Sequence, residues 1–257
     1  MPFTFSHPAI VLPLTFKRLK LSATALIIGS MVPDFEYFIR MTDHSRYSHT
    51  IAGLFWFDLP MGLLICFVYH GVVKDQLFNN LPPFLKQRVI VYKDFQWTKY
   101  FFKNWLVVCV CLVVGAASHI LWDAFTHESL SFVEKDPELS TVMRLGRVNL
   151  AGYRFLQLSS SLTGLLVVIL AIISLKKAPF DKTIDYRYWI IVGLIISTVM
   201  LMRTIAGMNF HDHRQVLVSF ISSSIIALIL APIILNEEER PGADFYRKTT
   251  DKNAIGE

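Results

Sequence analysis

The sequence predicts an all-α, polytopic transmembrane helical bundle. Hydrophobic residues make up 53% of the 257 residues and charged residues only 18%, and the mean hydropathy is +0.46. This composition is too apolar for an ordinary soluble domain. Apolar runs recur at a length suited to a hydrocarbon layer of ~30 Å, and they predict about six or seven membrane segments. Basic residues gather in alternate connections between the runs, as is typical of multi-pass membrane proteins.

The chain begins with a short apolar segment, residues 1–16. Ser6 can cap a helix and Pro8 suits its first turn, whereas Pro13 should kink the helix. If the residues that follow make a turn, His7 and Asp34 lie at one depth, roughly 18–22 Å from that turn at ~1.5 Å per residue. The alternative is that residues 1–16 lie flat on the inner membrane surface, so that His7 is merely interfacial.

The later membrane segments follow from the apolar runs. Five runs approach the length that a spanning helix needs, and they cover residues 51–70, 105–123, 155–175, 188–208 and 216–235. A sixth run, 21–38, is apolar up to Asp34. We therefore expect one transmembrane helical domain over residues 1–235. Residues 236–257 are charged and contain Pro and Gly, which predicts a mobile tail.

The distribution of basic residues predicts the orientation. The formal net charge is +5, and the charges gather in three connections that share one side if every run crosses. These connections contain Lys17, Arg18 and Lys20; Lys74, Lys86, Arg88, Lys93, Lys99 and Lys103; and Lys176, Lys177, Lys182 and Arg187. The positive-inside tendency makes that side cytoplasmic, together with the C-terminus. Orientation and contact with anionic membrane lipids account for these charges, so we expect no nucleic-acid partner.

A polar motif ends the run 105–123. His119, Asp123 and His127 recur at i, i+4 and i+8, a spacing that stacks two imidazoles and a carboxylate along one helical face. Both groups bind zinc at about 2.0–2.2 Å, so this face can hold a divalent metal, with zinc expected and manganese as the alternative. The other interpretation is a helix whose polar residues meet water at the membrane boundary.

Three further candidate ligands reach the same outer level in this topology. Asp34 lies just after a proline, His49 directly precedes the run 51–70, and His7 belongs to the N-terminal segment. With the motif described above they make six imidazole or carboxylate groups from four separate segments. Such a set predicts one zinc site with an open position, or two metals bridged by Asp34 or Asp123, at which an acidified water is the nucleophile.

One buried charge pair is also expected. Asp58 lies about two turns inside the run 51–70, where a carboxylate costs a few kcal/mol on insertion scales and needs a partner. Arg203 lies at a comparable depth in the run 188–208. We expect the two to form an ion pair, or Asp58 to orient a ligand histidine from behind. Arg203 can instead extend toward the headgroups.

Several motifs resemble a known family. The strings FTFSHPA, VPDFEY, SRYSHT followed by GLFWFDLP, and SHILWDAFTH look like the uncharacterised bacterial membrane family of the domain of unknown function 4184. The resemblance covers most of the chain and implies a multi-pass protein of the bacterial inner membrane. More distantly, the order His, Pro-Asp, Ser/Thr-His and His-x-x-x-Asp is similar to membrane-bound metal-dependent hydrolases and to zinc-dependent phospholipase C.

The distant resemblance implies a role for each matching residue. It implies metal ligands at the following positions: His7, Asp34, His49, His119 and Asp123. His127 is close to a further ligand position of the phospholipase C group. No downstream His-x-x-x-Glu matches that group, so the resemblance does not extend to a full three-zinc site.

These observations lead to a hypothesis about function. We expect a metal-dependent hydrolase with its site at the outer face, acting on a phosphoester or lipid-like substrate. Asp34 or Glu36 would serve as the base, and the sequence does not choose between them. One alternative is a non-enzymatic metal-binding membrane protein, such as a transporter or sensor, whose ligands should line a path through the midplane. The other is a structural membrane protein, in which the six groups do not converge.

Overall fold

The computed structural model describes residues 3–15, 19–42, 44–126, 142–145 and 148–235. Within them the protein is helical, apart from one short antiparallel ribbon in which Val142 pairs with Ala151. The elements in chain order are η1 (Thr4–Ser6), α1 (Pro8–Val11), η2 (Leu12–Thr15), α2 (Ala23–Gly29), η4 (Val32–Asp34), α3 (Phe35–Arg40), η5 (Leu54–Asp58), α4 (Leu59–Val68), η6 (Tyr69–Val73), α5 (Lys74–Asn80), α6 (Pro83–Val89), η7 (Ile90–Tyr92), α7 (Trp97–Thr126), β1 (Val142–Leu145), β2 (Val148–Ala151), α10 (Gly152–Ser174), α11 (Tyr186–Ile205) and α12 (His213–Ile234). The expected tail, 236–257, lies outside the described residues.

Five helices are long and apolar enough to cross a membrane. They are α7, α10, α11, α12 and the continuous helix Leu54–Asn80, which η5, α4, η6 and α5 form together. Each coincides with one of the five long apolar runs, so the prediction of a helical membrane protein is supported. Among the described residues these are the helices that meet the length and hydropathy for spanning. The expected total of six or seven segments is therefore not confirmed.

The two shorter apolar stretches do not form spanning helices. In the stretch 21–38, α2 ends at Gly29, and Pro33 lies in the separate turn η4, because a proline has no N–H to continue a helix. In residues 3–15, the described part of the N-terminal stretch, the structure has η1, α1 and η2, each far shorter than the about 20 residues that a crossing needs. The sixth apolar run, 21–38, is therefore not one spanning helix among the described residues, and these short segments instead pack against the long helices.

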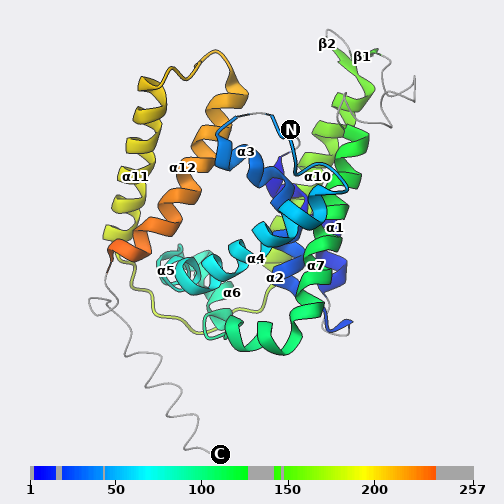
Figure 1. Cartoon of the computed structure of the whole chain (residues 1–257). Helices are drawn as coiled ribbons and strands as arrows, with labels where there is room; N and C mark the ends of the chain where they lie inside the picture. Colours follow the sequence, from blue (N-terminus) through cyan, green and yellow to red (C-terminus); the bar gives the residue numbers. More distant parts are fainter. Residues whose placement is uncertain (1–2, 16–18, 43, 127–141, 146–147, 236–257) are drawn as a thin grey trace, which may run out of the picture. The chain divides into compact units, whose positions relative to one another are not determined.

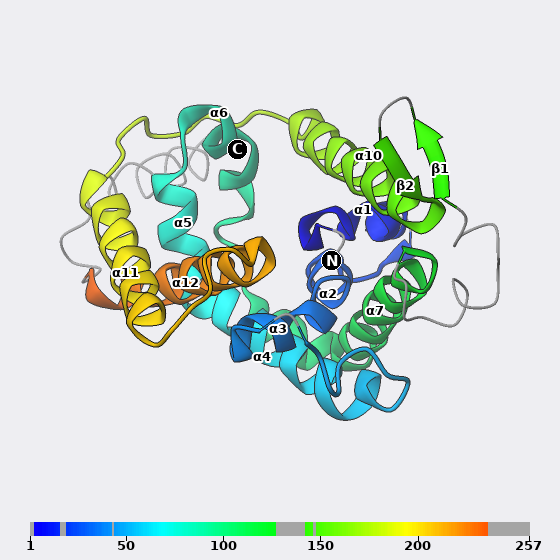
Figure 2. The ribbon, with the colours of Figure 1, turned by 90° about the horizontal axis from the view of Figure 1, so that it is seen from above.

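The chain forms two compact units, which we describe separately. The first contains Met1–Cys66 and Thr98–Ser174, and the second contains Phe67–Trp97 and Leu175–Glu257. In the first unit α1 contacts both α10 and α2, and Figure 2 shows α1 and α2 between α10 and α7. This arrangement brings the N-terminal segment, α2 and α7 together, and places His7 of the N-terminal segment near His119 and Asp123 of α7.

The close approach of α2 and α7 depends on two glycines. A Cβ atom on Gly29 would lie 2.5 Å from the backbone oxygen of Leu112, and one on Gly115 would lie 2.6 Å from the backbone oxygen of Leu26. Real Cβ atoms do not come this near, so only glycine allows the two backbones to meet here. The contact places the end of α2 beside the turn of α7 that precedes His119.

The second unit is built on the hairpin of α11 and α12, which lie side by side in Figure 1. Tyr188 and Val192 of α11 pack on Ala227 and Ala231 of α12. Asn80, at the end of α5, is bonded to this hairpin because its backbone oxygen accepts a hydrogen bond of 2.7 Å from the indole of Trp189. These contacts fix the C-terminal end of the helix Leu54–Asn80 against α11.

The glycine contact gives a first prediction. Gly115→Ala should lower the free energy of unfolding by about 1–3 kcal/mol, as overpacking does in tight interiors, although alanine alone favours a helix by about 1 kcal/mol. Thermal unfolding in detergent measures the change. Gly193→Ala in α11 is the control, because its Cβ would meet nothing within 4 Å. Equal stability of the two variants would contradict the proposed contact.

Candidate metal centre

The cluster is centred on the last turns of α7. His119 and Asp123 lie one turn apart on its buried face, at 0% and 1% exposure. His119 Nδ1 lies 2.7 Å from the backbone oxygen of Ser30, and a carbonyl oxygen only accepts hydrogen bonds. Nδ1 therefore carries the proton and donates it to Ser30. The lone pair of Nε2 is left facing the cluster, which is the tautomer that metal-binding histidines adopt.

Asp34 reaches the cluster from η4, at the start of α3. Its carboxylate is 1% exposed, and Oδ2 accepts a hydrogen bond from the hydroxyl of Thr4 in η1. Oδ1 lies 3.4 Å from Nε2 of His119 and 3.6 Å from Nε2 of His49. The Thr4 bond thus fixes one oxygen of Asp34 and directs the other into the cluster.

His49 closes the cluster from the segment that precedes η5. Its Nε2 lies 3.5 Å from Oδ2 of Asp123, and its side chain is 11% exposed. Its Nδ1 lies 3.0 Å from the hydroxyl of Ser48. An Nδ1–H that donates to that hydroxyl leaves the Nε2 lone pair directed at the two carboxylates.

The spacing of these four groups fits a metal site. The ligand atoms of Asp34, His49, His119 and Asp123 all lie within 4.8 Å of one another. The four distances from the imidazole Nε2 atoms to the carboxylate oxygens are 3.4, 3.4, 3.5 and 3.6 Å, longer than the usual N–H···O range of 2.7–3.2 Å. Ligand atoms about 2.0–2.2 Å from a tetrahedral zinc lie roughly 3.3–3.6 Å apart. The group could therefore hold a divalent cation.

His7 lies against this group as a fifth member. Its ring stacks on that of His119 with centroids 3.8 Å apart, and its Nε2 lies 3.7 Å from Oδ1 of Asp123. Neither ring nitrogen has a hydrogen-bond partner among the described residues. Burial and the neighbouring His119 lower the pKa of His7 to about 3, so the ring is neutral at physiological pH. Asp123 thus presents one oxygen to His7 and the other to His49 and His119.

The charges of the cluster are strongly coupled. Burial alone would raise the pKa of Asp34, but His119 and then His49 hold it well below its usual range. Burial would likewise lower the pKa of His49, but Asp123 and Asp34 raise it above the ordinary histidine value. Asp34 is therefore ionised at neutral pH, and a cation that binds must compete with a proton for His49.

Glu36 lies beside the cluster but its carboxylate faces the chain around residue 47. Oε1 accepts from the backbone N–H of Arg46 at 2.8 Å, and Oε2 accepts from the N–H groups of Tyr47 and Ser48 at 2.9 and 3.0 Å. Burial opposes ionisation, yet the N–H groups of residues 46–48 and the guanidinium of Arg40 lower the pKa of Glu36 to about 2. This carboxylate holds the segment that presents His49.

The expected charge pair of Asp58 is divided between the two units. Asp58 belongs to the first unit and Arg203 to the second, so their pairing stays a prediction. Asp58 is 1% exposed, and its carboxylate oxygens accept no hydrogen bond from the residues that the structure describes. It ends the π-helical turn η5, a distortion frequent at functional sites.

The structure brings five of the six expected ligands together, and one falls outside it. The five are His7, Asp34, His49, His119 and Asp123. His127 lies outside the described residues. Sequence reasoning missed Thr4, the backbone oxygen of Ser30 and the hydroxyl of Ser48, which orient the ligands. Thr4 and Ser48 stand one to three positions from a candidate histidine, whereas nothing in the sequence marks Ser30.

Comparisons with known proteins give one match. Residues 1–233 match the family described as "Domain of unknown function (DUF4184)". No curated protein matches the chain, and no solved structure matches it. The family match covers all five ligands of the cluster.

Glu36→Gln tests the support of His49. A glutamine presents one acceptor oxygen and one NH₂ donor, so at least one backbone N–H of residues 46–48 loses its partner. We expect a loss of about 2 kcal/mol in stability, in the range for hydrogen bonds to a charged group, and weaker metal binding in a zinc titration. Arg40→Ala removes only the guanidinium and should have a smaller effect. A zinc affinity in Glu36→Gln equal to that of the wild type would refute the positioning role.

The pH dependence of metal binding follows from the raised pKa of His49. Protons displace metal from imidazole, so affinity is full above the raised pKa and falls as pH drops through it, about tenfold per unit for one proton. The decline should begin above the usual histidine pKa of about 6.5. Equilibrium dialysis between about pH 8 and about pH 5 measures the metal affinity on both sides of the usual histidine pKa. A constant affinity over this range would contradict the role of His49 as a ligand.

Proposed function

We propose that this chain, which belongs to the DUF4184 family, is an integral membrane, metal-dependent hydrolase of phosphoesters. The observation that carries the proposal is the cluster of two carboxylates and two imidazoles with spacings close to tetrahedral zinc ligands. Nitrogen and oxygen donors of this kind suit zinc, with manganese as the alternative. The resemblance of the motifs to membrane-bound metal-dependent hydrolases and zinc-dependent phospholipase C supports the same chemistry.

The cluster has the parts that phosphoester hydrolysis requires. A divalent cation held by Asp34, His49, His119 and Asp123 would polarise a phosphoryl oxygen and lower the pKa of a water molecule. The neutral ring of His7, 3.7 Å from Oδ1 of Asp123, can extend the ligand set to a second cation. Asp123 would then contribute an oxygen to each of the two ligand sets, because Oδ1 faces His7 and Oδ2 faces His119.

The two candidate bases have different surroundings. Glu36 uses both oxygens to bind backbone N–H groups of residues 46–48, so neither oxygen is free to accept a proton from a water molecule in the cluster. Asp34 has one oxygen in the cluster and the other bonded to Thr4. Of the two candidates, we therefore assign the base to Asp34 and a positioning role to Glu36.

The alternative functions predict other arrangements. A transporter would distribute its ligands along a path through the midplane, whereas five groups gather here near one end of α7. A purely structural role would leave the same groups apart. We also propose, from the charge distribution, that the site faces the exterior of the bacterial inner membrane, with the C-terminus in the cytoplasm.

Metal content and hydrolysis test the proposal together. Detergent-purified wild type should contain zinc or manganese in stoichiometric amount, and His119→Ala and Asp123→Ala should lose it. Hydrolysis of the soluble diester bis(p-nitrophenyl) phosphate should fall by about 100-fold or more in both variants, since the cation activates the nucleophile. His211→Ala, an exposed histidine in the turn before α12, is the control and should change neither.

The outcomes separate the candidate functions. A wild type free of metal after purification without chelators would remove both the hydrolase and the sensor or transporter. A metal-loaded wild type that cleaves no phosphoester would favour the non-enzymatic metal-binding protein.

A further inference from the structure

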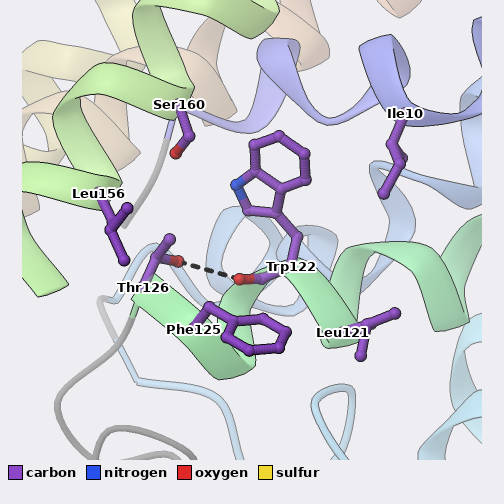
Figure 3. A pocket seen from close by; sticks show the side chains of 7 residues that line it. All are labelled: Ile10, Leu121, Trp122, Phe125, Thr126, Leu156 and Ser160. Atoms are coloured by element: carbon purple, nitrogen blue, oxygen red, sulfur yellow. Dashed lines mark hydrogen bonds between the residues drawn. The ribbon is translucent and has the colours of Figure 1, made fainter. Parts of the chain in front are cut away.

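An apolar pocket of about 280 Å³ opens beside the cluster, within the first unit. Its lining comes from α1, the last turns of α7 and the first turns of α10. The lining residues are Ile10, Leu121, Trp122, Phe125, Thr126, Leu156 and Ser160. In Figure 3 the indole of Trp122 stands between Ile10 and Ser160, with the other α7 side chains below it. No ligand of the cluster lines this pocket.

The two hydroxyls of the lining are engaged within their own helices, and the remaining polar group of the lining side chains is the indole N–H of Trp122 (Figure 3). The hydroxyl of Thr126 donates to the backbone oxygen of Trp122 at 3.3 Å, and that of Ser160 donates to the backbone oxygen of Gln157 at 3.3 Å. The pocket therefore presents almost only carbon to an occupant. It suits a hydrocarbon group, and its lining contains no charged side chain that could pair with a headgroup.

The pocket and the cluster share a wall. Trp122 precedes the ligand Asp123 in α7, and its ring lies edge-on to that of His7 with centroids 6.3 Å apart. Ile10 lies one turn after His7, and its backbone N–H donates to the His7 oxygen at 3.2 Å. A group held against Trp122 and Ile10 is therefore next to the residues that hold the metal.

The depth of the pocket in the membrane also favours one occupant. α7 and α10 are both candidate membrane spans, and the lining comes from the last six residues of α7 and the first nine of α10. α7 is bent at Asn104 (φ −131°, ψ 27°), and the part after the bend, residues 105–126, extends ~33 Å at ~1.5 Å per residue, close to the thickness of a ~30 Å hydrocarbon layer. The pocket thus lies near the level where headgroups meet acyl chains, and Leu121 and Phe125 are 54% and 43% exposed there.

We propose that this pocket binds an acyl chain of a phospholipid and directs the headgroup phosphate into the cluster. The substrate class is then a membrane phosphodiester, whose chain and phosphate are recognised by two adjoining sites. The inference rests on the proposed hydrolytic function. It adds that Trp122, Ile10 and Leu156 select substrates by hydrocarbon chain, although they bind no metal.

Crosslinking tests occupancy without requiring activity. A phosphatidylcholine with a diazirine in its acyl chain is incorporated into vesicles with the purified wild type and irradiated, and labelled peptides are mapped by mass spectrometry. We expect labels on the peptides of Trp122 and Leu156. Ser160→Phe places a ring in the pocket and should reduce the labelling. Ser159→Phe, at the adjacent position outside the lining, should not.

Hydrolysis tests whether the bound chain belongs to the substrate. The ratio of kcat/KM for a long-chain phosphatidylcholine to that for bis(p-nitrophenyl) phosphate should fall at least about tenfold in Ser160→Phe, since even one methylene in an apolar pocket changes selectivity 10–200-fold. The ratio should be maintained in Ser159→Phe. Retained metal in both variants shows that the cluster is folded.

Each result decides the inference. Pocket labelling together with the fall in the ratio supports it. Absence of labelling overturns it, even if the soluble diester is cleaved. If the pocket is labelled but the ratio of the two kcat/KM values is the same in Ser160→Phe and the wild type, the inference is overturned. It is also overturned if the pocket is labelled but only the soluble diester is cleaved. In both cases the pocket holds a membrane lipid that is not the substrate. A wild type that cleaves neither diester refutes the hydrolase and the inference together, and labelling then shows only that a lipid occupies the pocket.

Discussion

The hydrogen bond from His119 to the backbone oxygen of Ser30 is the interaction on which the site depends. It exists because Gly29 and Gly115 let α2 approach α7 closely enough for a side chain of one to reach the backbone of the other. The same contact fixes the tautomer of His119. A buried imidazole is thereby held with its free nitrogen toward the carboxylates, which is the arrangement a cation requires.

Two buried carboxylates within one small volume would repel each other strongly without compensation. The cluster compensates by alternating Asp34 and Asp123 with the imidazoles of His49 and His119. Thr4 and Ser48 add hydrogen bonds at the edges, and Glu36 fixes the segment that carries His49. Burying so many polar groups in an apolar protein costs stability, and the alternation of carboxylates with imidazoles offsets part of this cost.

The sequence predicts the long helices and the ligands better than the connections between them. Apolar runs of spanning length locate α7, α10, α11 and α12 because lipid demands internally bonded backbone, and the i, i+4 spacing locates His119 and Asp123. The breaks near Gly29 and Pro33 are not evident from hydropathy, which averages over them. The roles of Glu36 and Ser30 depend on contacts between distant segments, and local patterns do not encode these.

The order of the ligands along the chain bears on biogenesis. His7, Asp34 and His49 are synthesised within the first fifty residues, whereas His119 and Asp123 lie near the end of α7 and emerge only after the helix Leu54–Asn80 has been made. The cluster therefore cannot assemble until the translocon has released α7. During that interval the early acidic and imidazole groups must be accommodated in the bilayer without their partners. A bound metal ion would then link the N-terminal segments to α7, a helix that is inserted after them.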